Sequence, residues 1–396
     1  MKISWSGRAH NYEEQDIKFL VNIIKKADPL TQGKYLKKFE NDFANFIGKK
    51  NVFAVSSAAA ALEIIAALLQ LKKNDEVIIP AHTYCASAIP FARNNAKIIW
   101  SDIDLKTRTV DIDNIIKKIN KNTKAIVIVH LYGYAVDFSK LINICKKKNI
   151  KIIEDCAQSL GAEVNGKKTG SIGDFSCFSF HAQKNITTLG EGGMVYVKNP
   201  ILAKKVRGLR HNGHSSYSKN RKRYWLPAMV NLDLDLKNRW PHKFTLSEIQ
   251  CGAGIVMLKK LKRLNNLRIK RAKKFISKLS NFPEITFNPS FKKNRHVYHL
   301  LSALYKPKKG INRNHLIEIL SSKFNIICAT QFFPLYRYPL FKKMGLGKYN
   351  QCKNTEYFFD NMISFPFHVW MSEKKFDYLL QSTIRSLNIL RGKILK

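Results

Sequence analysis

Short apolar runs alternate with helical patterns through the first 200 residues of this 396-residue chain. The runs are rich in β-branched side chains, and the stretches between them have the spacing of amphipathic helices. The runs cover residues 52–55, 76–79, 98–100, 125–129, 150–153, 175–180 and 194–197, and the helical patterns cover 59–71, 114–119 and 138–148. This alternation predicts a mainly parallel sheet covered on both faces by helices, with ligands at the carboxyl ends of the strands.

The pattern changes in the second half of the chain. Residues 246–279 predict a long, basic, amphipathic helix or helix pair, and residues 297–305 predict a strand. Several helical patterns follow and end near Leu390, whereas residues 227–241 have the least regular pattern and predict a loop. We therefore expect two domains, a large one over residues 1–255 and a smaller α/β domain over residues 256–396.

Composition excludes several classes of protein. Hydrophobic residues make up 45% of the chain, which is ample for a large core. Neither an apolar N-terminal segment nor a run near the roughly eighteen apolar residues of a membrane helix occurs, so we expect a cytoplasmic protein without membrane insertion. The seven cysteines include no C-x-x-C pair, which favours buried free thiols over a metal site.

The formal charge of +41 is large. Basic clusters recur along the chain, and none lies in a helix-turn-helix, zinc-finger or RNP pattern, so we expect no specific nucleic-acid partner. A diffuse basic surface would instead attract small anionic substrates. A generally lysine-rich composition is the other interpretation. The clusters are residues 146–148, 204–205, 221–223, 259–263 and 306–309.

Lys184 stands between the apolar run 175–180 and a glycine cluster at residues 190–193. Upstream, Asp155 follows the apolar run 151–153. A lysine that can form a Schiff base, and an acid at a strand end, are what pyridoxal 5'-phosphate (PLP) requires of a protein. Among 69 lysines and arginines, a single lysine is ordinarily a solvated surface charge. The prediction therefore depends on the residues around it.

Two segments could hold the ends of such a cofactor. Residues 56–59 run from a strand into a helix, and the N–H groups of a helix N-terminus suit a phosphate. An ordinary serine N-cap explains the same pattern. Tyr84 follows another strand, where its ring could stack on the cofactor or belong to the core.

Three further polar residues lie near Asp155 or Lys184 in the sequence. Gln158 could reach the ring hydroxyl of the cofactor. Ser179 could bind the phosphate or be an ordinary strand serine. His181 is either a site residue or a histidine satisfied within its loop, and the sequence favours neither.

Taken in order, these residues resemble the DegT/DnrJ family of PLP-dependent nucleotide-sugar aminotransferases. The resemblance covers nearly the whole chain and implies fold type I, an α/β fold with a large PLP domain and a smaller C-terminal domain. It rests on Leu30-Thr31-Gln32-Gly33, Ser56-Ser57, Val129-His130-Leu131-Tyr132-Gly133, Glu154-Asp155-Cys156-Ala157-Gln158, Gly173-Asp174, Phe178-Ser179-Phe180, Lys184-Asn185, Gly190-Glu191-Gly192-Gly193-Met194, Leu209-Arg210, Gly213, Leu246-Ser247-Glu248, Pro334-Leu335-Tyr336 and Phe365-Pro366.

The resemblance implies a role for each candidate residue. Lys184 would be the Schiff-base lysine, and Asp155 would be the partner of the pyridine nitrogen. The remaining cofactor contacts would be Gln158 to the ring hydroxyl, Tyr84 stacked on the ring, Ser179 to the phosphate, and the backbone of Ala58 and Ala59 completing the phosphate cup.

Three departures from the family pattern stand out. The family usually has Gly-Thr where this chain has Ala58-Ala59, so a threonine hydroxyl for the phosphate is missing. The family often has an asparagine, donated by the partner subunit, where this chain has Lys243, which keeps a donor and adds charge. Residues 227–242 do not match the common pattern, which leaves the substrate contacts of that loop undefined.

The resemblance predicts an aminotransferase that takes an amino group from L-glutamate and transfers it to a keto group of a nucleotide-linked deoxy sugar. It also implies a homodimer with shared active sites and a product used in polysaccharide, glycan or antibiotic-sugar synthesis. A sister group of sugar 3-dehydratases carries histidine in place of the lysine, and Lys184 argues against that branch. The alternatives are a keto-inositol or non-nucleotide keto-sugar acceptor, or a non-catalytic binding protein that retains the fold.

Overall fold

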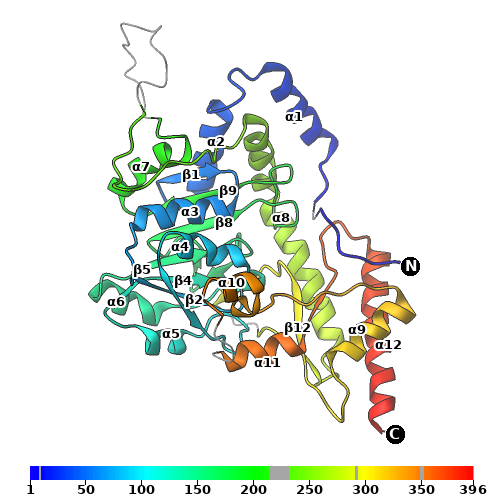
Figure 1. The fold of residues 1–396 in the computed structure, drawn as a ribbon. Coiled ribbons are helices and arrows are strands. Elements are labelled where there is room, and N and C mark those ends of the chain that lie inside the picture. The colour runs from blue at the N-terminus through cyan, green and yellow to red at the C-terminus, as the bar shows by residue number, and fades with distance from the viewer. Residues whose placement is uncertain (9, 215–231, 290–292, 348–351, 396) are drawn as a thin grey trace, which may run out of the picture.

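A seven-stranded sheet forms the centre of the protein in the computed structural model, which describes the chain except residues 9, 215–231, 290–292, 348–351 and 396. The strand order is β1-β9-β8-β5-β4-β2-β3 (Figure 1). The strands are β1 (Val52–Val55), β2 (Glu76–Pro80), β3 (Lys97–Ser101), β4 (Thr123–Val129), β5 (Lys151–Asp155), β8 (Phe175–Ser179) and β9 (Gly193–Val197). Every predicted run became a strand, and the prediction of a mainly parallel sheet is confirmed. Only β9 runs against its neighbours β1 and β8.

Helices cover both faces of this sheet. Along β4, Val127 and Val129 belong to the cluster that includes α3, whereas Ile126 and Ile128 belong to the cluster below α6. This period of two is the side-chain alternation of a strand that is buried on both faces. One face carries α3 (Ala58–Leu69), α4 (Ile89–Arg93) and α7 (Pro200–Arg210), and the other carries α2 (Lys34–Ile47), α5 (Ile112–Lys118), α6 (Ser139–Lys147) and part of α8 (Glu248–Lys278).

The predicted helix or helix pair over residues 246–279 is one continuous helix, α8. Ser247 caps its N-terminus in a reciprocal capping box with Gln250. The first residue of the helix, Glu248, accepts hydrogen bonds from the N–H groups of Gly33, Tyr35 and Leu36 and thereby caps α2 as well. Together with α1 (Glu14–Lys26), which also packs on α8, these contacts fix the N-terminal segment to the body of the protein.

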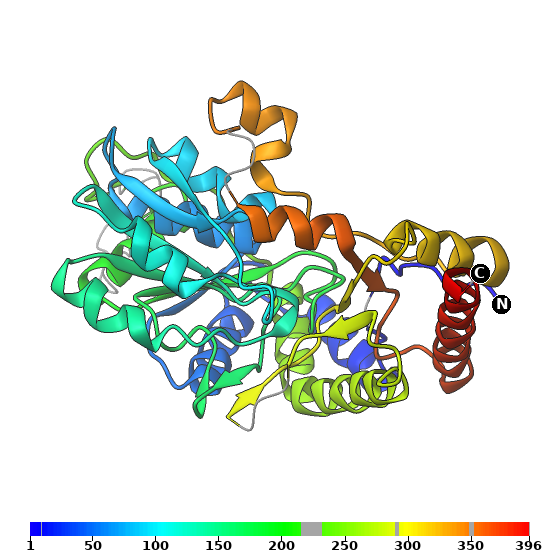
Figure 2. The ribbon, with the colours of Figure 1, turned by 90° about the horizontal axis from the view of Figure 1, so that it is seen from below.

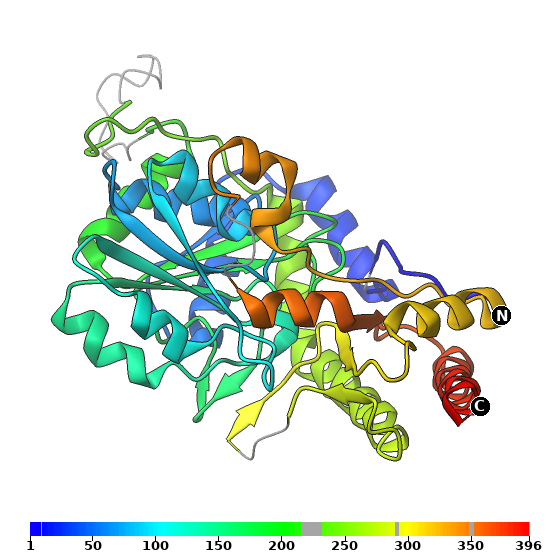
Figure 3. The ribbon, with the colours of Figure 1, turned by 60° about the horizontal axis from the view of Figure 1, so that its bottom comes forward.

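A second, antiparallel sheet with order β10-β12-β13 forms the core of the C-terminal part. Its strands are β10 (Ile285–Phe287), β12 (Leu301–Tyr305) and β13 (Met362–Phe365), and α9 (Arg313–Phe324) and α12 (Glu373–Leu395) pack against them. Figures 2 and 3 show these elements at the end of the molecule where both termini lie. Neither β10 nor β13 had a counterpart among the predicted strands.

The predicted strand over residues 297–305 is shorter in the structure. Residues 297–300 leave the small sheet and bond the loop after β4, where Val297 N donates to the carbonyl oxygen of Gly133 and Leu300 N to that of Tyr132. The backbone groups of this segment are satisfied by the large sheet's loop rather than by a strand partner.

The C-terminal half also returns to the large sheet. The ring of Phe341, in α10 (Pro339–Lys343), packs on Trp100 of β3, and Asp102 accepts hydrogen bonds from the N–H groups of Asn354 and Thr355 in α11 (Lys353–Asn361). α8 itself runs through residue 255, so the division into domains at that residue stays a prediction. The minor strands are β6 (Glu163–Val164), β7 (Lys167–Lys168) and β11 (Asn294–Arg295). None of the described helices is both long and apolar enough to cross a membrane.

Candidate active site

A cavity of about 870 Å³ opens at the carboxyl ends of the central strands and the N-terminus of α3. Seven of the eight predicted site residues line it, namely Ala58, Ala59, Tyr84, Asp155, Gln158, Ser179 and Lys184. The N-terminal segment and the C-terminal part close its other walls, with Trp5, Arg8, His299, Gln331, Phe367 and His368 among the lining residues. The cavity therefore lies where ligands of parallel sheets are expected.

Lys184 lies in the loop that follows β8. Its main-chain N–H donates to the carbonyl oxygen of His181, and its own carbonyl oxygen accepts a hydrogen bond from His10 Nε2. Burial lowers the pKa of the Lys184 amine to about 8, an effect that the nearby charge of Asp155 opposes. A lysine with this pKa is partly neutral near neutral pH, which a nucleophilic amine requires.

Asp155 ends β5 and is only 6% exposed. Its Oδ2 accepts a hydrogen bond of 2.7 Å from Ser87 Oγ, which is 2.9 Å from Thr83 Oγ1, and its Oδ1 accepts one of 3.0 Å from Ala157 N. Hydrogen bonds to a carboxylate offset the cost of burying its charge. The carboxylate is thus held in one orientation at the floor of the cavity.

Gln158 is oriented by the main chain of the loop after β4. Its Oε1 accepts a hydrogen bond of 2.8 Å from Tyr132 N, so its amide NH₂ is the group left to donate. Tyr132 has a φ of 61° and is fully buried. Its hydroxyl donates to the carbonyl oxygen of Gln331 and accepts from His82 Nε2, which locks this residue in place.

The N-terminus of α3 faces the same cavity. Ser57 is the N-cap, and its hydroxyl accepts a hydrogen bond of 3.0 Å from Ala60 N. The interpretation as an ordinary cap is thus confirmed for this serine. The N–H groups of Ala58 and Ala59 belong to the first turn, where a helix has no internal acceptor for them, and they remain for an anion.

The glycine cluster brings β9 against the start of α3. A Cβ on Gly193 would lie 2.4 Å from the carbonyl carbon of Ser57, so only glycine fits there. Gly193 pairs with Ser179 across the strands, and Ser179 is nearly buried beneath this approach. The expectation of close backbone approach at the cluster is met at this position.

The other predicted residues lie at the rim of the cavity or beyond it. Tyr84 is 59% exposed, so it is not a core aromatic, and its ring packs edge-on to Phe332 with centroids 6.1 Å apart. His181 accepts a hydrogen bond from Gln183 N at Nδ1 and lies 3.9 Å from Glu191, partly exposed. Lys243 is exposed and does not line this cavity.

The sequence did not reveal several residues that shape the site. Ser87, Thr83 and His10 reach it from distant segments and carry no local signal. Tyr132 belongs to a motif of the family resemblance, but the sequence predicted no role for it in the site. The basic cluster at residues 221–223 and residues 227–231 of the predicted loop lie outside the described residues.

Comparison with known proteins identifies the family. A sequence profile of the DegT/DnrJ/EryC1/StrS aminotransferase family matches residues 11–383. The chain belongs to this family. It is 30% identical over 328 residues to GDP-perosamine synthase of Vibrio cholerae, covering 83% of this chain and 84% of the relative. It is 31% identical over 373 residues to UDP-4-amino-4,6-dideoxy-N-acetyl-beta-L-altrosamine transaminase of Campylobacter jejuni, covering 92% of each chain.

The same relationship is seen in solved structures. The PMP-form of Spr1654 from Streptococcus pneumoniae superposes on this aminotransferase with a TM-score of 0.87 at 26% identity, covering all of both chains. The same pneumococcal protein is also known in its PLP-form. The predictions of fold type I, of an aminotransferase and of PLP as the cofactor are therefore confirmed.

The donor set of this aminotransferase fits that cofactor. The cavity offers an amine with a lowered pKa at Lys184, a hydrogen-bonded carboxylate at Asp155 and an amide NH₂ at Gln158. The first turn of α3 supplies free N–H groups for a phosphate. An aldehyde, a ring nitrogen, a ring hydroxyl and a phosphate each find a matching group.

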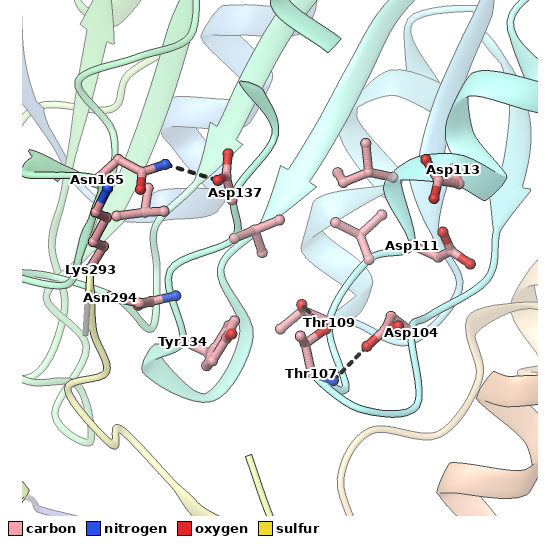
Figure 4. Close-up of a pocket in the computed structure, with 14 residues that line it drawn as sticks. Asp104, Thr107, Thr109, Asp111, Asp113, Tyr134, Asp137, Asn165, Lys293 and Asn294 are labelled. Carbon is pink, nitrogen blue, oxygen red and sulfur yellow. Dashed lines mark hydrogen bonds between the residues drawn. The ribbon is translucent and has the colours of Figure 1, made fainter. Parts of the chain in front are cut away.

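A second, smaller cavity of about 370 Å³ lies at the loops after β3 and β4 (Figure 4). It is acidic, but its carboxylates already have partners. Asp111 caps α5, Asp137 accepts a hydrogen bond of 2.8 Å from Asn165 Nδ2, and Asp113 pairs with Lys140. Lys293 is the only lysine among the described residues that line this cavity, and it is exposed, so we assign no chemistry to the cavity.

A buried group of His130, Glu154 and Cys156 has the donor types of a metal site. The donors are occupied, however. His130 Nε2 is 3.0 Å from Glu154, its Nδ1 accepts from Val136 N, and burial raises the pKa of the Cys156 thiol. Glu154 also accepts three N–H groups from the loop 170–173, so this cluster supports the strand that ends in Asp155.

Proposed function

We propose that this aminotransferase takes an amino group from L-glutamate and transfers it to a keto group of a nucleotide-linked deoxy sugar, in the synthesis of a polysaccharide or glycan precursor. The observation that carries the proposal is the position of Lys184 beside Asp155, on the floor of a cavity of about 870 Å³. Both curated relatives described above are named for the synthesis of amino sugars that carry GDP or UDP.

The residues have distinct roles in this proposal. Bound PLP supplies a protonated pyridine ring that draws electrons from the carbon beside the amino group. Asp155, oriented by Ser87, holds the ring nitrogen in its protonated state. Lys184 Nζ anchors the cofactor and then moves the proton at the reacting carbon, a task suited to a pKa of about 8. Gln158 donates its NH₂ to the ring hydroxyl.

The remaining predicted residues bind the phosphate of the cofactor or stack on its ring. The N–H groups of Ala58 and Ala59 and the hydroxyl of Ser179 bind the phosphate, and the exposed ring of Tyr84 stacks on the cofactor. Because Ala59 stands where the family usually has threonine, a hydroxyl that would bind the phosphate is absent. Lys243 of a second copy in a homodimer supplies the replacement donor. The exposed position of Lys243, away from its own cavity, supports this assignment.

The size of the cavity supports a large acceptor. Small-ligand sites span about 300–1,000 Å³, and this cavity of about 870 Å³ lies near the upper end of that range, which leaves room for an acceptor beside PLP. The formal charge of +41 favours an anionic substrate such as a sugar diphosphate ester. A keto-inositol or a non-nucleotide keto sugar is the alternative acceptor. The cytoplasmic location stays a prediction.

The absorption spectrum of the purified protein with PLP tests the first half of the proposal. We expect a long-wavelength band that is lost on addition of L-glutamate and restored by a keto-sugar nucleotide. Lys184→Ala should abolish this cycle, whereas Lys121→Ala, at an exposed position, should preserve it. A band that ignores L-glutamate would contradict the donor assignment.

A panel of acceptors tests the second half. GDP-, UDP- and dTDP-linked keto sugars are compared with keto-inositol and free keto sugars after the enzyme has reacted with L-glutamate. Restoration of the band by the free compounds alone would overturn the assignment of a nucleotide-linked acceptor.

A further inference from the structure

Arg268, in the middle of α8, is a buried cation that has no carboxylate partner among the described residues. The residue is 1% exposed, and its Nε and Nη2 atoms are enclosed and lack a hydrogen-bond partner. No ion pair with it occurs among the described residues. It is also the only described arginine with two such unpaired nitrogens. Burying a charge in this way is costly, so a compensating anion is expected to come from elsewhere.

Arg271, one turn further along the helix, shows what a structural arginine looks like in this protein. Its Nε and Nη2 donate to Glu373 Oε1, and its Nη1 donates to the carbonyl oxygen of Val369 at 2.7 Å. The described part of the chain therefore provides a carboxylate and a carbonyl oxygen for Arg271, but neither for Arg268.

The position of Arg268 points to the active-site cavity. Asn265 lies one turn earlier on the same face of α8 and accepts a hydrogen bond of 2.8 Å from Asn185, which follows Lys184 in the chain. The guanidinium of Arg268 lies 6.0 Å from the ring centroid of Phe367, and Phe367 lines the cavity. Arg268 is thus directly behind the wall at the lysine end.

Among the described residues, none of the charged groups that shift the pKa values of His10, His299 and His368 is an acid. Burial, and then the charge of Arg268 among others, lowers the pKa values of His10 and His368 to about 4. Burial, with the charges of Lys184 and Arg268, also lowers the pKa of His299 well below its usual value. The Nδ1 atoms of all three rings are buried without hydrogen-bond partners. Neutral imidazoles beside an unpaired guanidinium leave a positive potential on this side of the cavity, in a setting of low dielectric constant.

We propose that Arg268 supplies the charge of an anion subsite, behind Phe367 and beside His299 and His368, that recognises a carboxylate of the amino donor. The inference rests on the proposed function and extends it. A carboxylate is favoured over a phosphate because an amino acid that reacts at Lys184 carries its carboxylates within a few bonds of the reacting carbon. The diphosphate of a nucleotide sugar is separated from that carbon by the sugar ring.

Arg268→Met in the PLP-bound enzyme tests this subsite, with the rate of cofactor conversion measured against L-glutamate concentration. Arg268 does not line the cavity and acts through its charge from behind Phe367, so we expect its removal to raise the apparent Kd for L-glutamate about tenfold. The absorption of the bound cofactor should not change. Thermal unfolding of the donor-free enzyme should occur at the same or a higher temperature, because an unpaired buried charge has been removed.

Arg271→Met is the matched control on the same helix. Because Arg271 is paired, its loss removes a buried hydrogen bond to the carbonyl oxygen of Val369 as well as the bonds to Glu373, and we expect a lower unfolding temperature with little change in the apparent Kd. Glutarate, a dicarboxylate without an amino group, provides a probe that binds without reacting. Its Kd tests the subsite even if L-glutamate proves not to be the donor, so the two proposals can fail separately.

Three results would overturn the inference. One is an unchanged Kd for both L-glutamate and glutarate in Arg268→Met. A second is a fall in unfolding temperature with no loss of affinity, which would make the role purely structural. The third is a loss of affinity confined to a nucleoside diphosphate such as UDP or GDP, which would assign the charge to the acceptor.

Discussion

Lys184→Met in the cofactor-free protein should raise stability at neutral pH. Burial lowers the pKa of the lysine from 10.5 to about 8. At 1.36 kcal/mol per pH unit, this shift corresponds to a penalty of about 3 kcal/mol for holding the protonated amine in the native state. Because the side chain is partly exposed to the cavity, solvent screening reduces the expected gain to about 1–3 kcal/mol.

The sign of the pH dependence follows from the lowered pKa of Lys184. Below pH 8, the lysine is protonated in both the native and the unfolded states, and the penalty is fully present. Between pH 8 and 10.5, the native state loses the proton while the unfolded state keeps it, so the penalty fades. The advantage of the methionine variant over the wild type should therefore shrink by more than half near about pH 9.5.

Urea unfolding of both proteins at a series of pH values measures this difference. Lys121→Met, at an exposed position, is the control and should change the free energy of unfolding by no more than about 0.5 kcal/mol. A Lys184→Met variant that is less stable than the wild type at pH 7, or an advantage that is constant across the series, would refute the reasoning.

Three further changes test the groups around the cofactor site. Ser87→Ala removes a hydroxyl donor from Asp155 and should weaken PLP binding about tenfold, measured by titration of the cofactor-free protein; equal affinity would show that the hydroxyl is dispensable. Glu154→Ala removes the hydrogen-bond acceptor of His130 and of three loop N–H groups, so the free energy of unfolding in urea should fall by about 3–5 kcal/mol. A loss under about 1 kcal/mol would contradict this account. Tyr84→Ala should cost about 1 kcal/mol in PLP affinity while Tyr84→Phe keeps the wild-type value, and equal binding by both variants would exclude stacking.

Local sequence determined the strands and helices of the large sheet. Each apolar run became a strand because a strand buried on both faces needs apolar side chains at consecutive positions, a signal contained within a few residues. The same holds for α8, where periodicity over many residues predicted a helix, although the pattern did not decide between one helix and two. The sequence did not predict that β9 is antiparallel to its neighbours, because the residues of a strand do not specify which strand it pairs with or in which direction.

The residues of the candidate site likewise include some that the local sequence predicted and some whose role only the structure decided. Lys184 and Asp155 were predicted because each stands at the end of a recognisable run and within a family motif. The role of Ser57 was undecided, since a serine before a helix suits both a cap and an anion site. The hydrogen bond from Ala60 N established the cap and left the N–H groups of Ala58 and Ala59 without an acceptor inside the helix, as the proposed phosphate site requires.

Contacts between distant segments were decided only by the tertiary structure. Ser87 reaches Asp155 across 68 positions of the chain, and Tyr132 orients Gln158 through a main-chain N–H that any residue would have. Arg268 is one of 69 basic residues in the sequence, and only the packing of α8 against the loop of Lys184 shows that it is buried and unpaired. Burial and pairing depend on what the rest of the chain brings to a residue, so a local pattern cannot specify them.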